Sequence, residues 1–319
     1  MVAGDSNNLY PVYLRLLAYF MKGEETMIRN KRSQLLQQYL YVGPTALFFL
    51  CMVLVPFFLG IYYSFTSWNG ISSHVGWNGI QNYVHIFTRD YSFLNAFWFT
   101  AKFTVVALLL TNLLGFALAY ILTRRLFARN TLRAVFFIPH VIGGLLLGFI
   151  WQFIFVQGFS SIGELTGWSF FTLPWLGTGT TAFWAIVIVF VWQNAGYLMV
   201  IYISAINNVP SSLIEAAKVD GAGRSQLLRK VIIPLIMPAV TVCLFLTISW
   251  SFKLFDLNLS LTEGGPFKST QTVSLNIYEE AFTISRFGLG SAKAMIFFII
   301  VAIISLLQVR ATKKKEVEM

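Results

Sequence analysis

Six apolar runs constrain this chain more than any other feature of its sequence. They cover roughly residues 42 to 65, 99 to 122, 134 to 156, 182 to 205, 236 to 257 and 290 to 309. About 20 apolar residues in a helix cross the hydrocarbon core of a bilayer, and a helix satisfies its own backbone hydrogen bonds there. The composition agrees: 57% of the 319 residues are hydrophobic and 11% are charged, whereas soluble domains carry about 25% charge. The sequence therefore predicts an all-α polytopic membrane protein with six spans.

The basic residues give these spans an orientation. Lys and Arg gather before the first run, between the second and third, between the fourth and fifth, and after the sixth. Cytoplasmic loops carry such an excess, so we expect both termini and the polar stretch 208–234 to be cytoplasmic. The chain then divides into a cytoplasmic N-terminal segment 1–40, a transmembrane domain 41–310 and a cytoplasmic tail 311–319. This topology accounts for the formal charge of +10, and no nucleic-acid partner is expected.

The polar stretch 208–234 has the local signals of two short helices. Ser212, followed three residues later by Glu215, is typical of a capping box and places Glu215 in a first helical turn. Gly221 favours the end of that helix, and Ser225 can cap the next one. We therefore expect a helix, a glycine turn and a second helix on the membrane surface, a form suited to docking in the groove of a partner.

The same stretch carries a family resemblance. Glu215-Ala216-Ala217, then Gly221, then Val231-Ile232-Ile233-Pro234 resemble the EAA loop of ABC importer permeases, although the family form ends Ile-x-Leu-Pro. Asp220-Gly221-Ala222 is similar to the version found in the carbohydrate, or maltose-type, branch. Two further stretches, Gly76–Tyr83 and Thr262–Pro266, resemble segments beside the second and fifth spans of the same branch.

The resemblance implies a type I ABC importer permease core in a bacterial cytoplasmic membrane, and a sugar or oligosaccharide as the solute. It also implies four kinds of partner: a second, homologous permease subunit, two cytoplasmic ATPases, an extracytoplasmic solute-binding protein and the lipid bilayer. Coupling to the ATPase is assigned to Glu215, Ala216, Ala217, Asp220 and Gly221. The sequence has no phosphate-binding loop of the form G-x-x-x-x-G-K-[ST], so we expect no catalytic residue or cofactor in this chain, and ATP and Mg²⁺ on the partner ATPase.

Polar and aromatic residues inside the fourth run are candidates for the solute path. Trp192, Gln193, Asn194 and Tyr197 lie within about two helical turns. Amides can meet sugar hydroxyls, and flat aromatic faces can meet their C–H surfaces. Polar groups inside a membrane span are costly and therefore suggest a function.

The end of the fifth run adds Trp250, Phe252, Lys253 and Asp256 to this path. Lys253 and Asp256 are three residues apart, so in a continuous helix they would share one face and could neutralise each other. Two readings stay open: the pair lines the outer part of the solute cavity beside stacking aromatics, or it is a structural ion pair at the membrane boundary.

The remaining polar candidates are expected to be structural. Asn112, in the second run, is predicted to form a hydrogen bond to a neighbouring helix. His74, His85 and His140 have no metal-ligand spacing, so no metal site is expected.

Two alternatives to a sugar importer remain. One is an ABC permease for another solute, such as glycerol phosphate or an amino acid. The other is a stand-alone channel or secondary transporter, which would need no ATPase.

Overall fold

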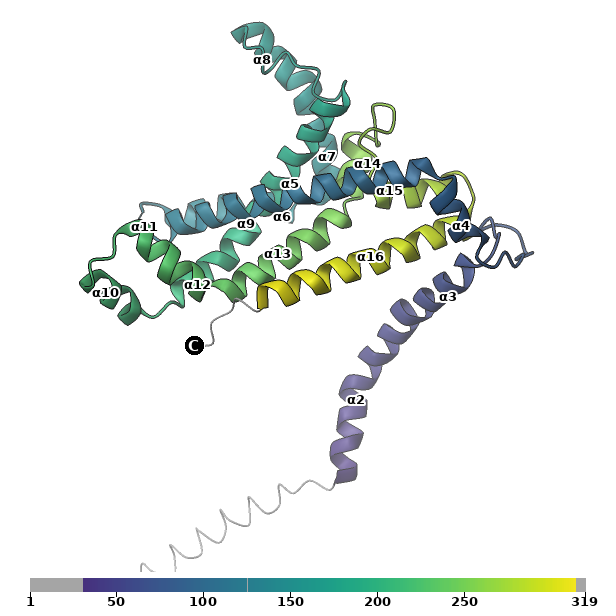
Figure 1. Cartoon of the computed structure of the whole chain (residues 1–319), viewed down its shortest axis with the longest axis horizontal. Coiled ribbons are helices and arrows are strands. Elements are labelled where there is room, and N and C mark those ends of the chain that lie inside the picture. Colours follow the sequence, from purple (N-terminus) through teal and green to yellow (C-terminus); the bar gives the residue numbers. More distant parts are fainter. Residues whose placement is uncertain (1–30, 125, 314–319) are drawn as a thin grey trace, which may run out of the picture. The chain divides into compact units, whose positions relative to one another are not determined.

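The structure is a computed structural model that describes residues 31–124 and 126–313 (Figure 1). Most of the predicted segment 1–40 and of the tail 311–319 lies outside these residues. The chain divides into two compact units, one up to Leu59 and one from Gly60 onward. The described residues are helical apart from loops and one antiparallel bridge between Thr66 and Trp77. The all-α prediction is therefore confirmed.

The described part of the first unit, from Lys31 onward, is a single long helical path. It begins with α2 (Lys31–Phe49), passes through the π-helical turn η1 (Leu50–Leu54) and continues into α3 (Val55–Ser64), which ends in the second unit. Its apolar part, Leu40–Ser64, is long enough to cross a membrane and corresponds to the first predicted span.

The second unit is a bundle of long helices with short helices at both ends. Its elements are α4 (Gln81–Thr88), α5 (Tyr91–Leu122), α6 (Arg129–Val141), α7 (Gly144–Phe153), η2 (Ile154–Gly158), α8 (Phe159–Thr166), α9 (Gly179–Asn207), α10 (Ser211–Val219), α11 (Arg224–Leu227), η3 (Leu228–Ile232), α12 (Ile233–Leu235), α13 (Met237–Phe252), α14 (Asp256–Leu261), α15 (Val273–Tyr278), η4 (Glu279–Thr283) and α16 (Phe287–Lys313).

Within the described residues, five helices are long and apolar enough to span a membrane, and a sixth span results if one bent pair is counted. The pair joins Arg224–Leu235 to Met237–Phe252 with a bend of 72°. The six-span prediction is met in this form, with a correction to the boundaries of the third span.

The third predicted span, 134–156, is wrong in its limits. Helix α6 stops at Val141, the backbone becomes extended at Ile142, and the helix that qualifies as a span is Gly144–Thr166. Pro139 and the glycine pair at 143–144 lie at this break, where a missing backbone donor and a flexible backbone weaken a helix.

Helix α9 lies at the centre of the bundle. The most apolar part of its span is 67% buried, whereas that of the other four spans is at most 28% buried. Gly196 permits the contact with α6, because a Cβ atom there would lie 1.8 Å from the carbonyl oxygen of Phe136. Close backbone approach at small residues is how membrane helices pack.

A substitution at Gly196 tests this contact. We expect Gly196→Ala to destabilise the fold by about 1–3 kcal/mol, the usual effect of overpacking a tight core. Gly143→Ala is the matched control, because no atom lies within 4 Å of a Cβ there. Thermal unfolding of the purified protein in detergent measures the difference, and equal midpoints for the two variants would contradict the proposed helix contact.

Polar contacts also join the helices. The Asn112 side chain donates to Thr247 Oγ1 over 3.1 Å and accepts from the Tyr202 hydroxyl over 2.8 Å. These bonds link α5 with α13 and α9, so the prediction that Asn112 bonds to a neighbouring helix is confirmed.

The two further stretches quoted with the family resemblance tie loops to helix ends. Asn82 donates to the carbonyl oxygens of Ser64 and Thr66, which anchors α4 to the end of α3. Asn258 of α14 donates to the carbonyl of Thr270 and to Thr262 Oγ1. Both loops are thus fixed by one buried amide side chain each.

Candidate coupling loop and solute path

Helix α10 is accessible to solvent or a partner along its whole length. None of its residues is buried, and Val219 is 87% exposed. Glu215, Ala216 and Asp220 are exposed, and Ala217 is half-buried. In Figure 1, α10 and α11 lie at one end of the bundle and α4 lies at the other. An exposed short helix with apolar side chains is a surface suited to a partner.

Gly221 ends α10 in a Schellman motif. Its φ of +79° lies in the left-handed region, the Ala222 amide donates to the carbonyl of Ala217, and the Gly221 amide donates to that of Lys218. A residue with a Cβ is strained at this φ. The prediction that Gly221 ends the helix is confirmed.

The helix starts differ from the sequence prediction. Pro210 is the N-cap of α10 and no side chain caps it, so the Ser212–Glu215 capping box is wrong and Glu215 lies in the second turn. Ser225 is not a cap either. Helix α11 follows Gly223, whose amide donates to Gln226 Oε1 over 3.1 Å.

The base of the loop is packed into the bundle. Val209, Ile232 and Ile236 are at most 8% exposed and belong to one apolar cluster with Leu122 at the end of α5 and Ile203 of α9. Close-packed side chains therefore connect the base of this loop to the ends of two long helices.

Two predicted path residues, Tyr197 of α9 and Trp250 of α13, meet in an aromatic cluster. Their ring centroids are 5.4 Å apart, and the His140 ring lies 4.5 Å from Tyr197 and 5.3 Å from Trp250. The sequence predicted only a structural role for His140, because its position beside α9 and α13 depends on how α6 packs in the fold. Phe137 extends the cluster, 6.2 Å from Tyr197.

The other three candidates of α9 have different surroundings. Trp192 is 42% exposed and its ring lies 5.4 Å from that of Trp151. The Gln193 amide donates to the carbonyl of Ile142 over 3.1 Å and so caps the break after α6. Asn194 is 6% exposed, and its amide donates to the carbonyl of Phe190 within its own helix.

The predicted shared helical face of Lys253 and Asp256 is wrong. Helix α13 ends at Phe252, and α14 begins at Asp256. Both side chains are exposed, and no ion pair joins them among the described residues. Phe252 is 2% exposed and contacts Phe297 of α16, with centroids 5.9 Å apart. The reading of a structural ion pair is therefore set aside.

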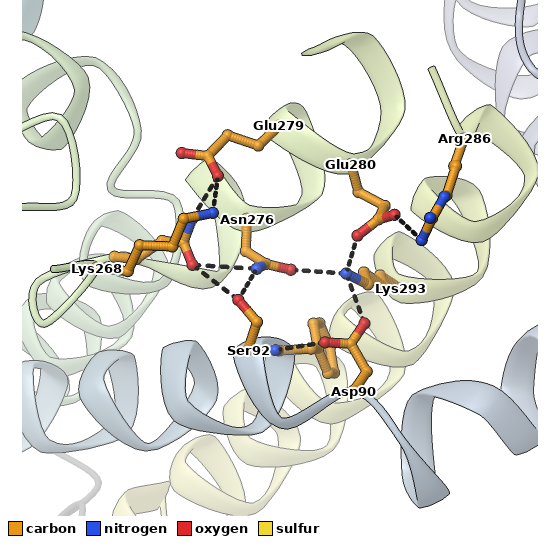
Figure 2. Close-up of polar contacts among 10 residues, drawn as sticks. Asp90, Ser92, Lys268, Asn276, Glu279, Glu280, Arg286 and Lys293 are labelled. Atoms are coloured by element: carbon orange, nitrogen blue, oxygen red, sulfur yellow. Dashed lines mark hydrogen bonds and ion pairs between the residues drawn. The ribbon is translucent and has the colours of Figure 1, made fainter. Parts of the chain in front are cut away.

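A buried ion cluster at the other end of the bundle was missed by the sequence analysis (Figure 2). Lys293 of α16 has no exposed side-chain surface, and its ammonium lies 2.8 Å from Asp90 Oδ2 and 2.7 Å from Glu280 Oε2. It also donates to Asn276 Oδ1 over 3.0 Å. The available signal was a single lysine inside the sixth apolar run, because a charge there requires a partner.

A protein-family model and a known relative each match most of this chain. Residues 112–316 match the family model described as the inner membrane component of binding-protein-dependent transport systems. A protein of Thermoanaerobacterium thermosulfurigenes, named probable starch degradation products transport system permease protein AmyD, is 50% identical over 283 residues, which cover 88% of this chain and 95% of that protein.

Two further relatives differ more. The multiple sugar-binding transport system permease protein MsmF of Streptococcus mutans is 33% identical over 262 residues, 82% of this chain and 90% of that protein. A chain in the crystal structure of a bacterial ABC transporter that imports alginate has a TM-score of 0.76 at 20% identity, covering 89% of this chain and 96% of that one. The family match and these identities lead to one conclusion: the chain belongs to the family of inner membrane components of binding-protein-dependent transport systems.

Proposed function

We propose that this chain is the permease subunit of an ATP-driven importer for sugars or oligosaccharides. The observation that carries the proposal is the 50% identity, over 88% of the chain, to a protein named as a permease for starch degradation products. The second relative is named for multiple sugars. Family membership in a binding-protein-dependent system speaks against the alternative of a stand-alone channel or secondary transporter.

The complete importer is proposed to contain a second homologous permease, two cytoplasmic ATPases and an extracytoplasmic binding protein. The exposed α10 helix and its Gly221 turn form the surface for an ATPase, with ATP and Mg²⁺ held by that subunit. The packed base of the loop at Val209 and Ile236 then carries the movement to α5 and α9. Both termini would be cytoplasmic, and the spans would rock between outward-open and inward-open states.

The solute path is proposed to use the exposed and half-buried candidates, namely Trp192, Gln193, Tyr197, Trp250, Lys253 and Asp256. Asn194 and Phe252 are buried within this chain. We expect these two side chains to act indirectly, by holding in place the helices that carry the other path candidates.

Co-expression tests the proposal. We expect the chain to co-purify with an ATPase and a second permease, and the assembled importer in vesicles to take up labelled maltodextrins when the binding protein and ATP are supplied. Uptake without ATP, or assembly without an ATPase, would contradict it. Uptake of glycerol phosphate or an amino acid in place of sugars would support the other solute class.

Cysteine labelling tests the path. In a cysteine-free background, with Cys51 and Cys243 replaced by Ser and Ala, we expect single cysteines at Trp192, Tyr197 and Lys253 to react with an aqueous reagent in at least one transport state. Cysteine at the fully buried Leu198, on the same helix as Trp192 and Tyr197, is the control and should stay unreactive. If all three test positions remain unreactive in every state, the assignment of the path fails.

A further inference from the structure

A recess lined mostly by polar residues opens at the end of the bundle opposite the stretch 208–234, the candidate coupling loop (Figure 1). It has a volume of about 440 Å³, and its lining includes Trp68, Gln81, His85, Arg89 and Arg286. These residues come from the loop after α3, from α4 and from the turn that precedes α16. None of the candidate path residues lines it.

The place of the recess in the fold follows from the long helices that run away from it. Helix α5 begins at Tyr91, directly after Arg89 and Asp90, and ends at Leu122 in the apolar cluster at the base of the coupling loop. Figure 1 shows α4 and α10 at opposite ends of the bundle. If α10 faces the cytoplasmic ATPases, as proposed above, the recess faces the extracytoplasmic side.

The recess carries positive charge. Arg89 and Arg286 line it, whereas no Asp or Glu does. Arg89 is exposed and forms no salt bridge among the described residues. Lys293 is shared by Asp90 and Glu280 (Figure 2). Together with Arg89 and Arg286, these five charged groups sum to one net positive charge.

Arg286 is held in place without using up its donors. Its nearest guanidinium nitrogen lies 3.5 Å from Glu280 Oε1, and that buried oxygen has no hydrogen-bond partner in the described part of the chain. Its backbone is fixed as well: Ser285 adopts φ +58°, and the Arg286 amide donates to the carbonyl of Glu280 over 3.0 Å. A guanidinium carries five donors in a planar fork that matches a carboxylate, so Arg286 offers most of its donors to an incoming anion.

We propose that this recess receives an Asp or Glu side chain of the extracytoplasmic binding protein when that protein docks. The inference rests on the proposed function, because it needs such a partner. A protein side chain fits better than a free solute, because the recess lies on the outer surface, whereas Tyr197 and Trp250 of the candidate path meet His140 between the helices. Complementary charge at a docking surface speeds association and fixes register.

The test measures binding of the solute-loaded binding protein to the complete importer in lipid nanodiscs. We expect Arg89→Gln and Arg286→Gln together to weaken binding about tenfold or more, and to reduce its dependence on salt concentration. Lys268→Gln is the matched control, because Lys268 is an exposed cation in a surface ion pair with Glu279 and lies outside the recess. That variant should bind within about twofold of the wild type.

Replacing Arg286 could also disturb its contact with Glu280, so a second variant changes Arg89 alone, which forms no salt bridge among the described residues. Arg89→Glu should weaken docking further, and reversing the matching acidic residue of the binding protein to Lys should restore it. Equal affinity of the wild type and both Arg89 variants would overturn the inference. So would a higher KM for free galacturonate with unchanged docking, since the recess would then be a solute subsite. Failure of the wild type itself to bind any binding protein would instead refute the proposed function.

Discussion

Gly221→Leu is expected to abolish uptake while the protein still inserts and folds. The reason is local: Gly221 has φ +79°, where a side chain costs about 1–2 kcal/mol, and no atom lies within 4 Å to add a clash. The Schellman turn between α10 and α11 would therefore change its path, which moves the proposed ATPase surface. The measurements are uptake in vesicles, ATPase co-purification and thermal unfolding of the purified subunit.

Gly223→Leu is the matched control in the same turn. Its φ of −69° is open to any residue, and it too has no atom within 4 Å of a Cβ. We expect this variant to transport nearly normally. Gly221→Asn should keep much of the activity, because Asn tolerates the left-handed region. If Gly221→Leu transports like Gly223→Leu, the turn does not couple the permease to an ATPase.

Lys293→Met is expected to destabilise the fold by about 3–5 kcal/mol, because it leaves two buried carboxylates without their shared cation. Asp90 and Glu280 are 9% and 10% exposed at their side chains, and Lys293 is fully buried. Asp90 also caps α5 by accepting from the Phe93 amide over 2.9 Å. The change would therefore loosen the N-terminal ends of α5 and α16 together. Thermal unfolding in detergent and limited proteolysis measure it.

A triple variant separates charge from packing. Lys293→Met with Asp90→Asn and Glu280→Gln removes the cation and both buried anions, so much of the lost stability should return. Lys268→Met is the control, because its ion pair with Glu279 is 60% exposed at the lysine and is worth at most about 1 kcal/mol. A single Lys293 variant as stable as the Lys268 control would show that the cluster contributes little.

Local sequence patterns were enough to predict the class of the protein and the two short helices of the stretch 208–234. Long apolar runs require helices in a membrane, and the spans at 182–205 and 290–309 appear in the structure as longer helices around the same centres. Gly221 was identified correctly because a helix end with a left-handed residue is a local property. The capping box at Ser212 was wrong because α10 begins two residues earlier than that pattern requires, after Pro210, and no side chain caps it.

The packing of the helices determines which side chains meet. Hydrophobic length located the third span but did not show that α6 ends at Val141, where Gln193 of a distant helix bonds to the carbonyl of Ile142. Helix packing also groups His140 with Tyr197 and Trp250. It brings Asp90 and Glu280 to Lys293, which is about 200 residues from Asp90 in sequence. Periodicity and charge describe one helix at a time, whereas burial of a charge is stable only when partners from other helices surround it.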